Sequence, residues 1–178
     1  FEQLSRRNQP AVAPVARSEA VLAAPGSAPP RPELEFWNGL GGFAAGGREY
    51  VTVLGEGRWT PAPWLNVVAN PSFGFQVSES GSGYTWSGNS RENQITAWSN
   101  DPVGDRPGEV LYLRDEDDGA LLAATPLPIR CEGGHYVARH GQGYSRFEHS
   151  AHGLALELLQ YVPIADPIKI SRLKIQNL

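Results

Sequence analysis

The stretch HYVARHGQGYSRFEHSAHGLALELL, residues 135–159, decides the fold class. Two runs, 135–140 and 144–149, flank a Gly-Gln-Gly segment, and a short glycine-containing connection of this kind is typical of a β-hairpin. Further along, leucines alternate with alanine and glutamate up to Leu158, which predicts a strand with one buried face. The stretch therefore predicts successive antiparallel strands.

The same pattern of short apolar runs and turn residues extends over residues 34–178. Short runs rich in β-branched and aromatic residues occur at 48–54, 65–69, 73–77 and 109–114, and each is bounded by glycine, proline, asparagine or acidic turn residues. Helical periodicity is almost absent. The sequence therefore predicts an all-β fold, a large antiparallel β-sandwich.

The last segment also alternates, but its apolar residues change parity between Ile170 and Leu173. A β-bulge near Ser171 and Arg172 would restore one apolar face. The strand pattern continues to Leu178. We expect a sandwich that is truncated at its C-terminal edge, with partner strands further along a parent protein.

Residues 1–33 differ in composition from the remainder. They are rich in alanine and proline, and they contain too few aromatic residues to offset the entropy of ordering. We interpret them as an interdomain linker, with residues 34–178 as the sandwich domain. The alternative is a tail that docks on its own domain.

Charge and composition exclude several partners. The formal net charge is −4, so the basic footprint of a nucleic-acid-binding protein is absent. No apolar run reaches the roughly 18–20 residues of a membrane helix, which predicts a soluble domain without direct membrane insertion. The single cysteine, Cys131, cannot form an internal disulfide.

Six runs in the middle of the chain form an ordered set of Gly, Trp, Asn and Ser motifs. In order along the chain they are NGLGGF with GREY (38–43, 47–50), TPAPWLNV (60–67), GF (74–75), SESGSGYTWS (78–87), NSREN (89–93) and WSNDP (98–102). In order and spacing these runs resemble the N-terminal sandwich domain of family 94 glycoside phosphorylases. They resemble in particular the phosphorylase-like region of cyclic β-1,2-glucan synthases.

The resemblance implies a mutarotase-like supersandwich within a larger enzyme. In that family a separate (α/α)6 barrel carries the catalytic acid, and inorganic phosphate is the co-substrate. The resemblance therefore implies that this domain is non-catalytic, has no cofactor of its own and contains none of the family's catalytic residues. The implied partners are the barrel of the same parent chain, a β-glucan oligosaccharide and a second copy in a homodimer. The implied location is the cytoplasmic face of a parent anchored in the bacterial inner membrane.

A dense set of aromatic and polar side chains is the candidate carbohydrate site. Sugar sites combine flat rings, which cover C–H faces, with amide, carboxylate and guanidinium groups, which bind hydroxyls. The alternative is that the tryptophans are core anchors and the polar residues cap turns. The candidate residues are Tyr84, Trp86, Arg91, Glu92, Asn93, Trp98, Asn100 and Asp101.

Metal and hydrolytic chemistry are not predicted. The acidic run 115–118 lacks the spacing of an EF-hand and is interpreted as a solvated hairpin tip. His149 and His152 flank a predicted turn, with no carboxylate matched to them in the sequence, so no metal site is predicted. Glu79 and Asp101 are the pair to consider for a glycosidase, which the family resemblance disfavours.

Two rival functions remain open. An autonomous carbohydrate-binding module would expose Trp64, Trp86 or Trp98 as a platform. A pure assembly domain would instead self-associate through unpaired sheet edges.

Overall fold

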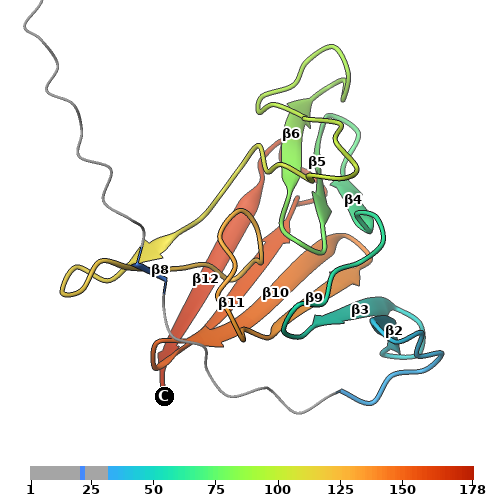
Figure 1. The fold of residues 1–178 in the computed structure, drawn as a ribbon. Coiled ribbons are helices and arrows are strands. Elements are labelled where there is room, and N and C mark those ends of the chain that lie inside the picture. Colours follow the sequence, from blue (N-terminus) through green and yellow to red (C-terminus); the bar gives the residue numbers. More distant parts are fainter. Residues whose placement is uncertain (1–20, 23–31) are drawn as a thin grey trace, which may run out of the picture.

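The computed structural model describes Val21–Leu22 and residues 32–178, and all its regular elements are β-strands arranged in three sheets (Figure 1). The largest sheet has six antiparallel strands in the order β12-β11-β10-β9-β3-β2. Their bounds are Ile170–Asn177 (β12), Leu154–Tyr161 (β11), Tyr144–Ala151 (β10), Tyr136–Gly141 (β9), Glu49–Leu54 (β3) and Gly41–Ala44 (β2). The all-β fold class is therefore confirmed.

Two small sheets accompany the six-stranded one. The first is antiparallel and consists of Leu65–Ala69 (β4), Phe73–Ser78 (β5) and Gly83–Ser87 (β6). The second consists of Val21–Leu22 (β1), Ala120–Leu122 (β8) and Leu113–Arg114 (β7). Figure 1 shows β4, β5 and β6 rising over the six-stranded sheet near β9 and β10.

The stretch that decided the fold class forms β9, β10 and β11. Gln142 and Gly143 connect β9 to β10, so the predicted hairpin is confirmed. Along β10 every second residue is buried, including Phe147, because one face of the strand meets the core. Leu156 and Leu158 are buried on β11, as the alternation predicted.

The core lies between the six-stranded sheet and the small sheets. Phe75 and Val77 on β5 belong to the same apolar cluster as Phe147 and Leu158 on the large sheet. Leu122 on β8 also belongs to this cluster. Burial of these side chains from three sheets holds the layers together, because each removes apolar surface from water.

Two predictions about strands were wrong. Residues 109–112 form no strand, because the Glu109 carboxylate accepts hydrogen bonds from Thr85 and Thr96 and pairs with Lys169, which draws this segment against β6. The bulge expected near Ser171 is also absent. Strand β12 pairs with β11 in an unbroken register from Tyr161–Ile170 to Leu154–Asn177.

The change of parity has a simple cause. Ile168 lies before β12 and so does not belong to the pattern of the strand. Ile175 lies within β12 but is about half exposed, so the apolar residues of the strand need not all face the core. Among the described residues, β12 pairs only with β11 and is an edge strand of the large sheet.

Part of the predicted linker falls within the described residues. Val21 and Leu22 pair in parallel with Ala120 and Leu121 of β8. The remaining predicted linker, up to residue 31, lies outside the described residues. The boundary at residue 33 stays a prediction.

No helix among the described residues meets the length and hydropathy that a membrane crossing requires.

Candidate functional site

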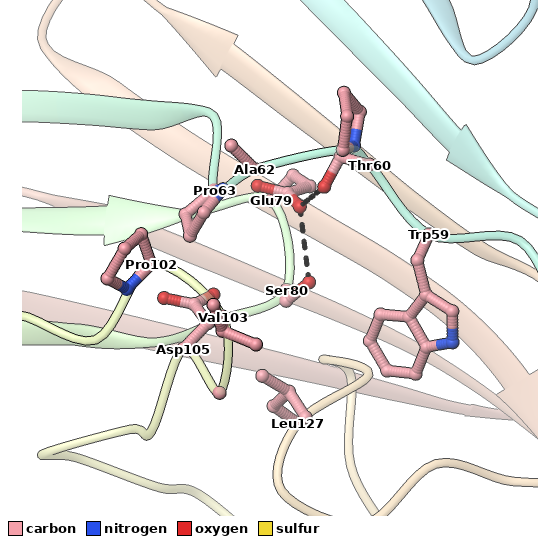
Figure 2. Close-up of a pocket in the computed structure, with 12 residues that line it drawn as sticks. Trp59, Thr60, Ala62, Pro63, Glu79, Ser80, Pro102, Val103, Asp105 and Leu127 are labelled. Atoms are coloured by element: carbon pink, nitrogen blue, oxygen red, sulfur yellow. Dashed lines mark hydrogen bonds between the residues drawn. The ribbon is translucent and has the colours of Figure 1, made fainter.

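Two adjoining pockets form the candidate site. The larger, of about 410 Å³, lies where residues 59–63, the β5–β6 turn and residues 102–105 meet (Figure 2). The smaller, of about 180 Å³, shares four of its lining residues with the larger: Ala62, Pro63, Pro102 and Asp105. We call the two pockets together the Trp59–Trp98 groove, after a tryptophan that lines each of them.

Glu79 anchors one wall of the groove from the β5–β6 turn. Its side chain is 1% exposed, and both carboxylate oxygens accept hydrogen bonds from within the chain. Oε2 accepts from the Trp64 backbone N–H at 2.7 Å, while Oε1 accepts from the hydroxyls of Thr60 and Ser80. Burial nevertheless raises the pKa of Glu79, because desolvation outweighs these hydrogen bonds. Glu79 therefore fixes the position of residues 60–64.

The turn that carries Glu79 depends on Gly81. Its φ is +90°, and a Cβ atom there would lie 2.4 Å from the Thr125 Cβ. A glycine is required because both the left-handed backbone and this close approach exclude a side chain. The approach brings Leu127 to the groove, where its N–H donates to the Ser80 carbonyl.

Asp105 forms the opposite wall. Its Oδ2 accepts a hydrogen bond from the Ser78 hydroxyl at 2.6 Å, and its backbone N–H donates to the Asp101 carbonyl. Burial raises the pKa of Asp105, and the hydrogen bonds from Ser78 and Ser82 oppose this effect. The neighbouring Asp101 behaves differently, since N–H groups of Gly104 and Val103 bind its carboxylate and lower its pKa.

Each pocket of the groove is lined by a half-exposed tryptophan. Trp59 is 47% exposed, and the Arg130 guanidinium lies 4.4 Å from its ring centroid. Arg130 also donates to the carbonyls of Arg58 and Gly55, which fixes the guanidinium beside the ring. Trp98 is 46% exposed and stacks on Tyr84, with ring centroids 5.4 Å apart.

The predicted site residues do not all lie together. Trp98, Asn100 and Asp101 line the smaller pocket. Tyr84 is buried behind Trp98, and Trp86 is partly buried against Tyr84, so these two rings belong to the interior side of the site.

The other three predicted residues lie on the exposed segment after β6. Arg91 and Glu92 form an exposed ion pair of 3.4 Å, and their backbone N–H groups donate to the Asn89 side chain. Asn93 donates to the Ser87 carbonyl. None of these three residues lines either pocket.

Sequence reasoning missed Trp59 and Asp105 as members of the site. Trp59 gave no clear signal, because Pro61 and Pro63 restrict the backbone of Thr60 and Ala62 and do not determine where the tryptophan ring lies. Asp105 gave no such signal, since its neighbour Ser78 lies 27 residues away.

A second group of polar side chains combines two segments that were interpreted separately from the sequence. Asp115 and Asp118 lie beside His152, so the prediction that no carboxylate matches this histidine was wrong. These three are the residues of the described chain that could hold a metal ion.

Comparison with known proteins gives a consistent assignment. Residues 48–178 match the family model "Glycosyl hydrolase 94, supersandwich domain". The chain is 46% identical over 145 residues to the cyclic beta-(1,2)-glucan synthase NdvB of Rhizobium meliloti (strain 1021), which covers 82% of this chain. It is 29% identical over 139 residues to an N,N'-diacetylchitobiose phosphorylase of Vibrio furnissii, which covers 77% of this chain. It is also 28% identical over 146 residues to the solabiose phosphorylase of Paenibacillus borealis, covering 78%.

The chain spans only a small part of each of these relatives. It covers 5% of the glucan synthase, 17% of the chitobiose phosphorylase and 18% of the solabiose phosphorylase.

Proposed function

The chain belongs to the glycosyl hydrolase 94 supersandwich-domain family, and on this basis we propose that it is a non-catalytic, glycan-facing domain of a larger carbohydrate-active enzyme. The parent would be a cyclic β-1,2-glucan synthase or a related phosphorylase. Its catalytic (α/α)6 barrel would follow in the same chain, with inorganic phosphate as co-substrate. The observation that carries this proposal is the Trp59–Trp98 groove.

The groove has the side chains that saccharides need. Two half-exposed tryptophan rings offer flat apolar faces, and Asn100 and Asp101 offer amide and carboxylate groups for hydroxyls. The larger pocket alone falls within the roughly 300–1,000 Å³ range of ligand pockets. A bound glucan segment would therefore lie along the groove.

The state of the carboxylates supports a role without bond cleavage. A glycosidase needs two carboxyl groups that are free to act on the sugar. Both oxygens of Glu79 already accept hydrogen bonds from the chain, and the Asp101 Oδ1 accepts the backbone N–H groups of Val103 and Gly104. Glu79 is thus a positioning residue for the groove wall.

Dimerisation and location belong to the parent enzyme. We propose that the domain contacts a second copy in a homodimer and that it lies on the cytoplasmic face of a membrane-anchored parent. Both statements follow from what the resemblance of the six motif runs to this family implies.

Calorimetric titration with a β-1,2-gluco-oligosaccharide tests the groove directly. Trp59→Ala and Trp98→Ala should each weaken binding by about fivefold or more, since an aromatic platform contributes about 1–3 kcal/mol. Phe36→Ala is the matched control, because Phe36 is 84% exposed and lies outside the groove. Equal affinities for all three variants and the unmodified chain would contradict a glycan-facing groove.

An autonomous carbohydrate-binding module is the second candidate. The half-exposed Trp98 favours it, because a module needs an accessible ring. The two functions differ in affinity: a module binds oligosaccharide tightly by itself, whereas a wall of a composite site binds weakly until the barrel is present.

A further inference from the structure

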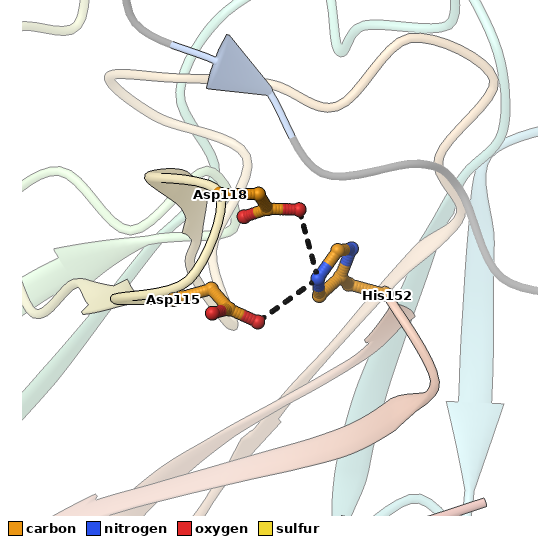
Figure 3. A group of neighbouring side chains, drawn as sticks. All are labelled: Asp115, Asp118 and His152. Carbon is orange, nitrogen blue, oxygen red and sulfur yellow. Dashed lines mark hydrogen bonds and ion pairs between the residues drawn. The ribbon is translucent and has the colours of Figure 1, made fainter.

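Two turns from different sheets bring three metal-ligating side chains together (Figure 3). Asp115 and Asp118 lie in the turn between β7 and β8. His152 lies in the two-residue turn between β10 and β11. The side chains thus converge although the sequence separates Asp115 and His152 by 37 residues.

The three ligand atoms lie within 4.8 Å of one another, and both separations from the histidine nitrogen suit one ion. The His152 Nε2 lies 3.0 Å from the Asp115 Oδ2 and 3.4 Å from the Asp118 Oδ2. Ligands at about 2.0–2.2 Å from a metal are about 3.0 Å apart in octahedral and about 3.4 Å apart in tetrahedral geometry. A single ion therefore fits between the three atoms with only small side-chain movements.

The carboxylates are held in this orientation by their own turn. The Asp115 Oδ1 accepts a hydrogen bond from the Asp117 N–H at 2.8 Å, and the Asp118 Oδ1 accepts one from the Ala120 N–H at 2.8 Å. Each carboxylate thereby keeps its second oxygen toward the imidazole. Such outer hydrogen bonds are what orients the ligands of protein metal sites.

A tight turn fixes the backbone of the histidine. His152 has φ +52° and is followed by Gly153 with φ +71°, so both residues of the turn are left-handed. Histidine is among the side chains that tolerate this region, though an asparagine or glycine is more usual in such a turn. The turn places the imidazole between the two carboxylates.

We propose that Asp115, Asp118 and His152 form a binding site for a divalent first-row transition metal ion, with Zn²⁺ as its probe. One imidazole nitrogen with two carboxylates suits Zn²⁺ or Mn²⁺ better than Mg²⁺ or Ca²⁺, which prefer oxygen ligands alone. All three side chains are partly exposed, which leaves room for water to complete the coordination. The ion would join the β7–β8 turn to the β10–β11 turn and so link two sheets.

Isothermal titration of the chelator-treated protein with Zn²⁺ tests this site. We expect one ion per chain, and a melting temperature that rises with added Zn²⁺ because the ion binds only the folded state. His152→Asn and Asp118→Asn should each weaken binding by at least about tenfold, since each removes one ligand. Asparagine at 152 keeps the preference for the left-handed turn, and asparagine at 118 keeps the oxygen that caps Ala120.

Asp117→Asn is the matched control, because Asp117 lies in the same turn but outside the three-residue cluster. It should bind Zn²⁺ as the unmodified chain does. Melting curves without metal show whether each variant is folded. The proposal is overturned if the binding of Zn²⁺ shows no saturation. It is also overturned if a folded His152→Asn variant binds Zn²⁺ with unchanged affinity. In either case the three residues form an ion pair only.

Discussion

The ring of Tyr84 stacks on the ring of Trp98 with centroids 5.4 Å apart and planes 20° from parallel. Tyr84 is a buried residue of β6, whereas Trp98 is half exposed in the groove. Strand β6 therefore supports the ring of Trp98 through the buried ring of Tyr84. The structural core and the proposed glycan surface are joined at this pair.

Shortening Tyr84 should damage both stability and the groove. We expect Tyr84→Ala to lower the free energy of unfolding by about 3–5 kcal/mol, because it removes a buried ring and leaves a cavity. Tyr84→Phe keeps the ring and should cost less than about 1.5 kcal/mol. Urea unfolding measures both. Equal losses for the two variants would show that the phenolic hydroxyl, and not the buried ring, carries the contribution of Tyr84 to stability.

Asn66 should be the polar residue that fastens β4 to the large sheet. Its side-chain amide donates to the carbonyls of Gly141 and Tyr144 and to the Ser145 hydroxyl. Asn66→Ala leaves these groups without their donor, and we expect a loss of about 1–3 kcal/mol in urea unfolding.

The adjacent Val67 provides the control for this measurement. It is 60% exposed on the same strand, so Val67→Ala should change stability by no more than about 0.5 kcal/mol. If Val67→Ala lowers the free energy of unfolding as much as Asn66→Ala does, the loss comes from any change in β4 and not from the amide of Asn66.

His140 should make the fold sensitive to acid. Burial lowers its pKa to about 4 from the ordinary 6.5, and its ring nitrogens lie 3.0 Å from the Ser145 hydroxyl and 3.2 Å from the Trp64 carbonyl. The unfolded chain therefore binds a proton first as the pH falls below 6.5, so stability decreases between pH 6.5 and pH 4. The loss is about 3 kcal/mol when complete.

Comparison with His140→Gln isolates this effect. Burial raises the pKa values of Glu79 and Asp105, so these groups change stability with the opposite sign in acid. The quantity to measure is therefore the difference in unfolding free energy between the two proteins at each pH. This difference should shrink as the pH falls from 7 to 4, and a constant difference would contradict a neutral, buried His140.

Local patterns predicted the regular parts of the fold well. The Gly-Gln-Gly hairpin and the leucine alternation up to Leu158 depend on neighbouring residues, and both were confirmed. The strand predicted at 109–114 forms only at its end, Leu113–Arg114, because Glu109 is held by Lys169, 60 residues further along. The sequence shows alternation, but it does not show which distant cation will pair with a carboxylate.

The candidate site was predicted in part for the same reason. Trp98 and Asp101 lie on one segment, and both line the groove as a dense local motif would suggest. Trp59 reaches the groove from a separate segment, and Asp105 is fixed there by Ser78 of β5, so only the sheet arrangement brings these residues to the site. His152 and Asp115 likewise meet because two turns of different sheets lie at the same end of the sandwich.

We propose that this chain forms a glycan-facing surface and performs no bond cleavage by itself. One titration with β-1,2-gluco-oligosaccharide and inorganic phosphate tests both parts, with tryptophan fluorescence and glucose 1-phosphate followed in the same sample. We predict saturable quenching that Trp98→Ala reduces, with no glucose 1-phosphate released. Release of glucose 1-phosphate in proportion to the protein, or fluorescence that never changes with sugar, would contradict the account.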